Sequence, residues 1–300
     1  MAAPLLAVGV LLLGSGGALD TLPVWELRGD PSSEDPVERG AYLARAGNCV
    51  VCHTEDPEEP AGFLAGGKEV PSPFGAFHST NITPDPETGI GGWSEADFVR
   101  SMREGRSPDG THFYPAFPYT SFTGMTDGDL SDLYAYLQAV PAVRQENRPH
   151  DLRWFATLGP GLAAWKTLNF REWRFEADPQ RDEEWNRGAY LSQAVAHCAE
   201  CHSSRTRTGA IVANRRYGGT SEGPDGQPSP NITPDETGIA GWSQRHLERY
   251  LEFGMTPEGD FAGGSMAEVI NHGTGYLTPE DRRAIAVYIL SLAPIRNEVD

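Results

Sequence analysis

The chain has 300 residues, of which 39% are hydrophobic and 22% charged, an ordinary globular composition that can bury one large core or two smaller ones. The formal net charge is −18 at pH 7. Nucleic acid binding requires basic surfaces, so this charge argues against DNA or RNA as a partner, and it suits a soluble surface that could meet a basic face on another protein.

Residues 1–19 form an apolar, uncharged segment that ends in small residues. The apolar run from Pro4 to Leu13, followed by small residues through Ala18, predicts a secretory signal peptide cut near Ala18. No Lys or Arg precedes the run, so an uncleaved N-terminal anchor is the alternative. Export is favoured over a cytosolic location, and it predicts a periplasmic protein, either soluble or attached to the outer face of the cytoplasmic membrane.

Several segments of the chain occur twice. R-G-A-Y-L begins at Arg39 and again at Arg187, and N-I-T-P-D begins at Asn81 and again at Asn231. This internal repeat predicts two tandem modules, which span residues 36–140 and 187–297. The connector between them, residues 141–186, contains four tryptophans and is too aromatic for a flexible tether, so we expect it to pack across both modules: Trp154, Trp165, Trp173 and Trp185.

Helix start signals recur in both modules. Ser94 and Ser243 are predicted N-caps, and Thr126 and Thr278 each precede an Asp by three residues, which predicts a capping box. Pro279 suits the first position of the last helix. Apolar residues follow these caps at helical spacing and two-residue alternation is weak, so the predicted fold is mostly α-helical.

All four cysteines lie in two C-x-x-C-H motifs, Cys49-Val-Val-Cys52-His53 and Cys198-Ala-Glu-Cys201-His202. Two cysteines at this spacing can each add to one vinyl group of a haem and form thioether bonds, and the next residue, His, then lies beneath the iron as its proximal ligand. Two such motifs inside a repeat predict two covalently bound haem c groups, with His53 and His202 as iron ligands.

Three other uses of these cysteines compete with haem attachment. A zinc site could use two C-x-x-C pairs, but compact zinc sites take pairs that lie nearer in the chain. A thioredoxin-like redox pair expects a strand–helix unit and no following His. Structural disulfides suit an exported protein, yet they leave the paired histidines unexplained.

The second axial ligand differs between the modules. In the second module Met266 stands in the glycine-rich stretch F-A-G-G-S-M and is the predicted ligand, while Met255 directly follows a helix and is the weaker candidate. In the first module Phe117 stands about where Met266 does. Met125, His112 or a five-coordinate iron remain open there, in that order, because Met125 could equally be a hydrophobic staple residue.

The N-I-T-P-D segments follow each C-x-x-C-H motif at closely matching distances. We expect them to form a wall of each haem pocket and to supply a carbonyl that accepts the ring N–H of the proximal His. The alternative is a proline or Asx turn that ends a loop.

The repeated motifs, with F-Y-P-A-F-P-Y-T-S, give a resemblance from about Arg39 to Asn297. The sequence resembles the multihaem cytochrome c subunits of membrane-bound quinohaemoprotein alcohol dehydrogenases, sugar-acid dehydrogenases and some molybdenum hydroxylases. The resemblance implies an exported electron-transfer protein that accepts electrons from a dehydrogenase and passes them toward quinone or an oxidase. The alcohol dehydrogenase subunits carry three haem motifs and a Met where Phe117 stands, and this chain departs from them at both points.

Three functions follow from these patterns. The first is an exported dihaem cytochrome c that transfers electrons from a dehydrogenase partner toward the respiratory chain and has no substrate chemistry of its own. The second is an enzyme, such as a dihaem peroxidase or a thiosulfate-oxidising cytochrome, which uses an open or unusually ligated first haem. The third is a passive structural haem protein.

Overall fold

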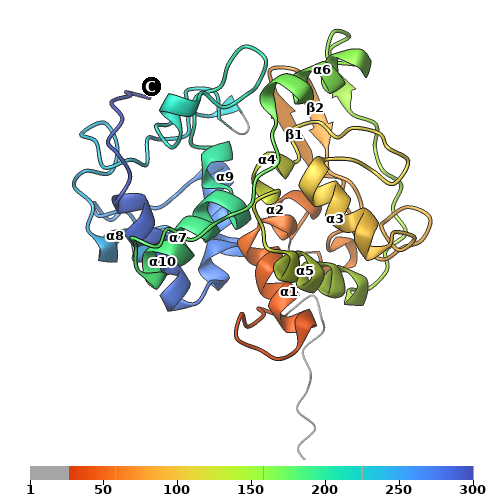
Figure 1. Cartoon of the computed structure of the whole chain (residues 1–300), viewed down its shortest axis with the longest axis horizontal. Helices are drawn as coiled ribbons and strands as arrows, with labels where there is room; N and C mark the ends of the chain where they lie inside the picture. Colours follow the sequence, from red (N-terminus) through yellow and green to blue (C-terminus); the bar gives the residue numbers. More distant parts are fainter. Residues whose placement is uncertain (1–26, 58, 158, 224–225, 300) are drawn as a thin grey trace, which may run out of the picture.

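The computed structural model describes residues 27–57, 59–157, 159–223 and 226–299 (Figure 1). The predicted signal peptide or anchor, residues 1–19, lies outside this range. The prediction of a mostly helical protein is confirmed, although three short strands are also present. Across the described residues, every helix is too short or too polar to cross a membrane.

The N-terminal half is built on two helices that cross closely, α1 and α5. A Cβ on Gly40 of α1 would lie 2.0 Å from the carbonyl oxygen of Asp132 in α5, so only glycine permits this contact. The helices of this half are α1 (Pro36–Ala46), α2 (Cys49–His53), η2 (Pro60–Gly62), α3 (Glu95–Glu104), α4 (Tyr119–Phe122) and α5 (Asp127–Ala139).

The C-terminal half repeats this arrangement, with α7 against α10. A Cβ on Gly188 would lie 1.8 Å from the carbonyl oxygen of Ala284. The glycine of each R-G-A-Y-L segment therefore has the same task. The helices are α7 (Glu183–Tyr190), the π-helical turn η3 (Leu191–Val195), η4 (Cys198–Glu200), η5 (Ala213–Arg215), α8 (Gln244–Phe253), α9 (Gly264–His272), η7 (Thr274–Tyr276) and α10 (Pro279–Leu290).

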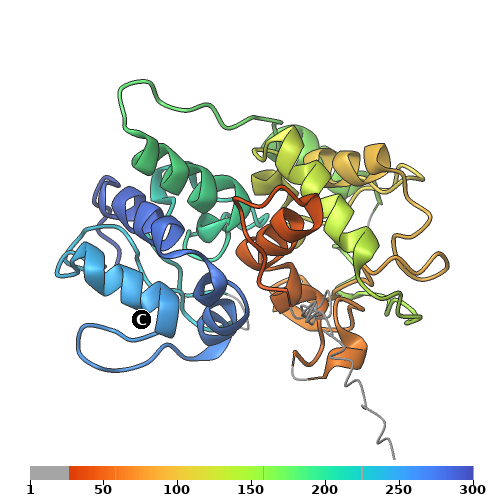
Figure 2. The ribbon, with the colours of Figure 1, turned by 90° about the horizontal axis from the view of Figure 1, so that it is seen from below.

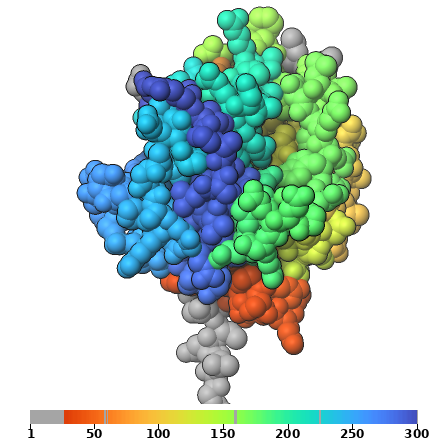
Figure 3. Space-filling view, turned by 60° about the vertical axis from the view of Figure 1, so that its left-hand side comes forward, coloured from red at the N-terminus to blue at the C-terminus, as the bar shows by residue number. Residues whose placement is uncertain are grey.

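The segment between the halves runs over the surface and contacts both of them. It adds strand β3 (Asp151–Leu152) to an antiparallel sheet with β2 (Gly75–His78) and β1 (Glu69–Ser72), and it carries helix α6 (Gly159–Asn169). The Nε1–H groups of Trp165 and Trp173 donate to the carbonyl oxygens of Thr208 (2.7 Å) and Thr120 (3.1 Å). Figure 3 shows this segment, in green, between the blue C-terminal half and the yellow part of the N-terminal half.

The helix caps are as predicted at the two serines. Ser94 and Asp97 form a reciprocal capping box at α3, and Ser243 forms one with His246 at α8. Pro279 occupies the first turn of α10. These caps satisfy backbone N–H groups that the first helical turn leaves without partners.

The capping boxes predicted for Thr126 and Thr278 are only half correct. The hydroxyl oxygen of Thr126 accepts the backbone N–H of Asp129, and that of Thr278 accepts the backbone N–H of Asp281. The backbone N–H of each threonine, however, donates to a tyrosine hydroxyl of the other half of the molecule, and the same hydroxyl donates to the Asp carboxylate. A contact between sequence-distant segments thus replaces the local one.

These tyrosine contacts are reciprocal across the interface between the halves. The Tyr42 hydroxyl donates to Asp281 Oδ2 (2.6 Å) and accepts the Thr278 N–H (3.2 Å). The Tyr190 hydroxyl likewise donates to Asp129 and accepts the Thr126 N–H (3.2 Å). Each half therefore completes the start of the closing helix of the other, and Figure 2 shows α1, in red, lying against the blue C-terminal half.

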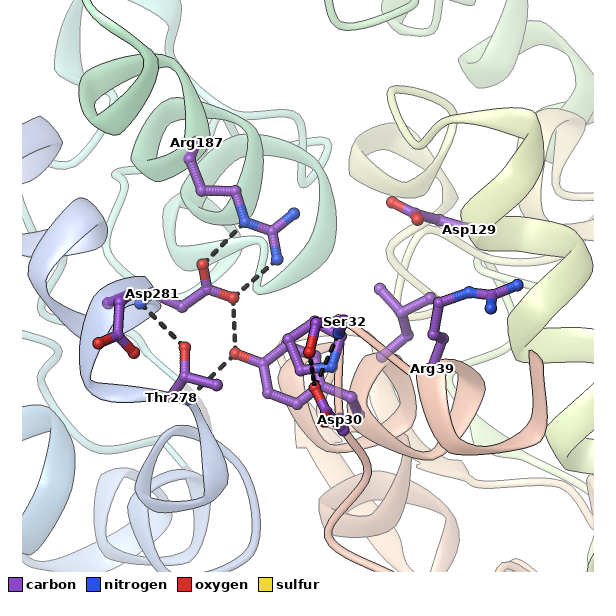
Figure 4. A pocket seen from close by; sticks show the side chains of 11 residues that line it. Asp30, Ser32, Arg39, Asp129, Arg187, Thr278 and Asp281 are labelled. Atoms are coloured by element: carbon purple, nitrogen blue, oxygen red, sulfur yellow. Dashed lines mark hydrogen bonds and ion pairs between the residues drawn. The ribbon is translucent and has the colours of Figure 1, made fainter. Parts of the chain in front are cut away.

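A cleft of about 410 Å³ opens at this interface (Figure 4). Arg187 and Asp281 form a bidentate ion pair on one side of it, with N···O distances of 2.8 and 2.7 Å, while Arg39 and Asp129 lie on the other side. Arg39 is paired with Asp132, outside the cleft lining. The two arginines that line the cleft are thus already neutralised by carboxylates.

Candidate functional site

Each C-x-x-C-H motif begins after a residue in the left-handed backbone conformation. Asn48 has φ 57° and His197 has φ 41°, and each is followed by a short helical turn, α2 or η4. Because one turn separates its two cysteines, each motif presents two thiols and an imidazole from a single local element. The four cysteines form no disulfide with one another; Cys52 is exposed and the other three are half-buried.

The two histidines are held in the same way. His53 Nδ1 lies 2.7 Å from the carbonyl oxygen of Thr80, and His202 Nδ1 lies 2.9 Å from that of Pro230. A carbonyl only accepts, so Nδ1 carries the proton in each bond and Nε2 keeps the lone pair that a metal requires. The carbonyl comes from the residue just before Asn81 or Asn231, one position ahead of the N-I-T-P-D segment that was expected to supply it.

A glycine also fixes each histidine through the backbone. The Gly66 N–H donates to the His53 carbonyl (2.7 Å), and the Gly219 N–H donates to the His202 carbonyl (2.9 Å). Both glycines have positive φ, and a Cβ on either would lie within 2.7 Å of the backbone of the N-I-T segment. Glycine is therefore required at both positions.

Sequence reasoning missed these glycines and the hydroxyls that support the same loops. Thr54 Oγ1 accepts the Leu64 N–H (3.1 Å), and Ser203 Oγ accepts the Tyr217 N–H (3.0 Å). Leu64 and Tyr217 have φ of 58° and 68°, which is rare for residues other than glycine. Each motif is followed by Thr or Ser and, further on, by a pair of glycines, in L-A-G-G or Y-G-G-T, so an alignment of the two halves is the signal that could have found them.

The N-I-T segments close the loop onto the end of each half. Asn81 Oδ1 accepts from the N–H and hydroxyl of Thr83, and its Nδ2 donates to the Val143 carbonyl (2.7 Å). Asn231 makes the same bonds with Thr233 and Ile295. Both Asn side chains are fully buried. The segment is therefore an Asx turn that also places the carbonyl for the histidine.

Burial sets the protonation of these groups. It lowers the pKa of His53 and His202, against the opposing effect of their carbonyl bonds, and so favours neutral imidazole. Burial also raises the pKa of Cys49 and Cys201 to about 12 and that of Cys198 to about 11. A neutral imidazole is the form that binds a metal through Nε2.

The described residues contain no group of three or more His, Cys, Asp or Glu side chains that could hold a metal ion. The two C-x-x-C pairs are thus not assembled into one zinc site. The donor set of each motif, two thiols with a backbone-held imidazole, fits a covalently attached haem.

The residues that precede the two motifs contact each other across the interface. His197 Nε2 lies 3.3 Å from the Gly47 carbonyl oxygen, and its ring packs edge-on against Phe122 at 5.3 Å. Glu200, inside the second motif, accepts from the hydroxyls of Thr120 (2.7 Å) and Ser121 (2.8 Å) of the N-terminal half. The chain therefore brings the two attachment segments side by side.

The candidate second ligands occupy different environments. Met266 lies half-buried in the first turn of α9, after Gly263 and Gly264. Met255 lies 3.7 Å from an Arg249 guanidinium nitrogen, which acts as donor to its sulfur. These positions do not test ligation, so Met266 stays a prediction.

In the N-terminal half an aromatic cluster takes the place of a methionine. Phe117 packs against Phe113, Tyr119 and Phe122, with ring centroids 5.6–6.5 Å apart. Met125 is fully buried in the core and follows this cluster in the chain. His112 faces the connector instead, with Nδ1 3.3 Å from Lys166 Nζ, and burial together with Lys166 lowers its pKa.

Comparison with known proteins gives matches over most of the chain. A family model described as Cytochrome c matches residues 37–141. The chain is 38% identical over 288 residues to a protein of Cereibacter sphaeroides named diheme cytochrome c-type, and this match covers 93% of the chain and 94% of that protein.

Other relatives are longer proteins. The chain is 43% identical over 258 residues to a subunit of the nicotinate dehydrogenase of Pseudomonas putida, covering 85% of the chain and 21% of that protein. It is 36% identical over 283 residues to the gluconate 2-dehydrogenase cytochrome c subunit of Pantoea cypripedii, covering 91% of the chain and 63% of that protein. The chain therefore spans less than two thirds of either of these relatives.

Proposed function

The chain belongs to the family of dihaem cytochromes c and dehydrogenase cytochrome c subunits, and on this premise we propose that it is an exported dihaem cytochrome c which passes electrons from a dehydrogenase toward the respiratory chain. Haem c, when bound, supplies a one-electron couple. The protein residues attach it, hold its ligands and set its surroundings.

The duplicated histidine geometry is the observation that carries this proposal. Cys49 and Cys52 would attach one haem and Cys198 and Cys201 the other, in two tandem modules joined by the aromatic connector. His53 and His202 each offer Nε2, because a backbone carbonyl holds Nδ1 at 2.7 or 2.9 Å. Such a bond fixes the ring orientation and raises the basicity of the ligand.

The second ligands in this proposal are Met266 and Met125. Met125 is preferred to His112 because it lies inside the core of the N-terminal half, whereas the ring of His112 faces Lys166. A thioether ligand raises the potential of a haem, which suits transfer toward an oxidase.

The partner in this proposal is the catalytic component of a dehydrogenase. Relatives named as subunits of gluconate and nicotinate dehydrogenases support it. Contact between the two attachment segments, through His197 and Gly47, supports transfer within the chain, with no reaction on an organic substrate.

Mass spectrometry of the full chain tests this proposal, with expression in a host competent for cytochrome c maturation. We expect the mass of the polypeptide plus two haems, and c-type absorption bands on reduction. A chain that carries bound zinc and no haem overturns the proposal, and a mass showing a single haem overturns the two-module part of it.

A second candidate function is an enzyme with an open first haem, and the Phe117 cluster is the observation that favours it. Four aromatic rings line the region where the other half carries Met266. If Met125 does not ligate, the ferric protein shows a high-spin band and turns over peroxide. A fully low-spin protein without peroxide turnover rejects this function.

A further inference from the structure

Two segments of the chain, one of which contains α6, carry a charge opposite to that of the whole chain. Residues 152–171 and 201–217 contain no Asp or Glu, although the chain has 42 of these residues. The same two segments contain seven Lys and Arg residues: Arg153, Lys166, Arg171, Arg205, Arg207, Arg215 and Arg216. Because the whole chain carries a net charge of −18, this gap in the acidic surface calls for an explanation.

The two segments are joined in space by a chain of contacts. The Trp154 and Phe155 rings lie 6.0 Å apart, and Phe155 lies 6.5 Å from Phe74. A Cβ on Gly209 would lie 3.2 Å from the Phe74 ring, and the neighbouring Thr208 accepts the Trp165 N–H. Leu168 is one helical turn beyond Trp165. We call this surface the α6 face.

Large apolar side chains protrude from the α6 face. Trp154 is 76% exposed, Phe155 45% and Leu168 83%. They are most of the exposed large apolar side chains among the described residues; the remaining two, Phe253 and Phe261, lie in the C-terminal half. Such side chains cost free energy in water and indicate a surface that another body covers.

Four cations on the α6 face are exposed and form no ion pair within the described part of the chain: Arg153, Arg171, Arg207 and Arg215. By contrast, Arg205 is paired with the buried Glu200 at 2.7 Å, and the Lys166 amine points inward to the Gly105 carbonyl. The available positive charge is therefore grouped with the protruding apolar side chains, and it complements an anionic surface.

We propose that the α6 face binds the surface of an anionic lipid bilayer. Protein partners usually bind an aromatic anchor in a fitted pocket, whereas a bilayer interface accepts any protruding Trp or Leu and attracts Arg to its headgroups. The face lies at the end of the molecule opposite residues 27–35 (Figure 1).

Vesicle sedimentation with the haem-loaded full chain tests this inference. The vesicles contain either equimolar phosphatidylglycerol and phosphatidylcholine or phosphatidylcholine alone. We expect binding to the anionic vesicles that weakens as salt is added. Trp154→Ser with Leu168→Ser should reduce partitioning by about tenfold or more. Arg153→Gln with Arg207→Gln should reduce it by about tenfold on the anionic vesicles only.

The matched control is Phe253→Ser with Phe261→Ser. These residues are 60% and 69% exposed, but Glu252, Glu258 and Asp260 surround them in the sequence, so their loss should leave binding unchanged. If the control variant loses vesicle binding as strongly as Trp154→Ser with Leu168→Ser, the proposal is overturned. It is also overturned if the wild-type chain binds neither kind of vesicle, and an acidic protein is then the favoured partner of the α6 face. The haem spectrum checks folding of every variant, and failure here does not affect the proposed electron-transfer function.

Discussion

The two halves of the molecule hold their histidines with the same backbone contacts, yet they differ on the side where a second ligand would stand. The carbonyl, the glycine and the hydroxyl that support His53 have counterparts around His202. Phe117 and Met266, in contrast, lie at the same place in the repeat and share no chemistry. The two copies of a duplicated site can thus keep the contacts that hold the histidine and differ at the position opposite it.

The largest effect is expected from removing one pair of cysteines. Cys49→Ala with Cys52→Ala, or Cys198→Ala with Cys201→Ala, should each leave one haem, because each pair attaches its own group. The mass should fall by one haem and the reduced absorption by about half. If either double variant keeps both haems, the halves are not separate sites.

The next effect concerns the second ligands. Met266→Phe copies the first half into the second and should make that haem high-spin and lower its potential, because a thioether raises the potential. Met125→Leu introduces the residue found at the matching position, Leu277, and should make the first haem high-spin and lower its potential. His112→Gln should leave the spin state and potential of both haems unchanged. Low-temperature EPR distinguishes these results, and a bis-histidine signal from the first haem rules out Met125.

A smaller effect is expected at the interface between the halves. Tyr42→Phe leaves the buried Asp281 without one donor, and Tyr190→Phe does the same to the more exposed Asp129. Each should lower the free energy of unfolding by about 1–3 kcal/mol, with the larger loss at Tyr42. Denaturant titration measures both. Tyr134→Phe, whose hydroxyl bonds within one half to the Trp93 carbonyl, is the control, and unfolding of the halves in separate steps should appear only in the interface variants.

The smallest effect depends on pH. Burial alone raises the pKa of Glu200, but Arg205 and the hydroxyls of Thr120 and Ser121 together hold it below its ordinary value of 4.5. Glu200→Gln should therefore cost roughly 1–2 kcal/mol near neutral pH. Because the folded pKa is lowered, the difference from wild type is complete above about pH 4.5 and disappears as the pH falls through the folded value. Unfolding titrations across this range measure it, and a difference independent of pH contradicts the assignment.

Local signals in the sequence predicted much of this structure. The serine caps, Pro279 and the mostly helical fold depend on neighbouring residues and are confirmed. The two C-x-x-C-H motifs predicted the family, because this spacing of two cysteines and a histidine is typical of covalent haem attachment. The N-I-T-P-D segments were expected to supply the carbonyl acceptor for each histidine, and the observed acceptors, Thr80 and Pro230, lie one residue before them.

What the sequence did not predict depends on contacts between distant segments. The capping boxes at Thr126 and Thr278 are only half correct, because the hydroxyls that accept the threonine N–H groups belong to Tyr190 and Tyr42 of the other half. No local pattern around His197 indicates its contact with the Gly47 carbonyl, which lies 150 residues away in the chain. The strand β3 was not predicted because its two residues are too few to show an alternation of polar and apolar side chains. Its hydrogen-bond partner is β2, which is distant in the sequence.

The tyrosine exchange between the halves has the form of an isologous contact, the kind that a symmetric homodimer makes. In such a dimer every substitution occurs in both protomers, so the loop that contains Phe117 or Met266 could not differ between them. Joining both copies in one polypeptide removes that constraint. It allows Phe in one copy and Met in the other, and in the proposed dihaem protein this difference would give two redox potentials within one folded chain.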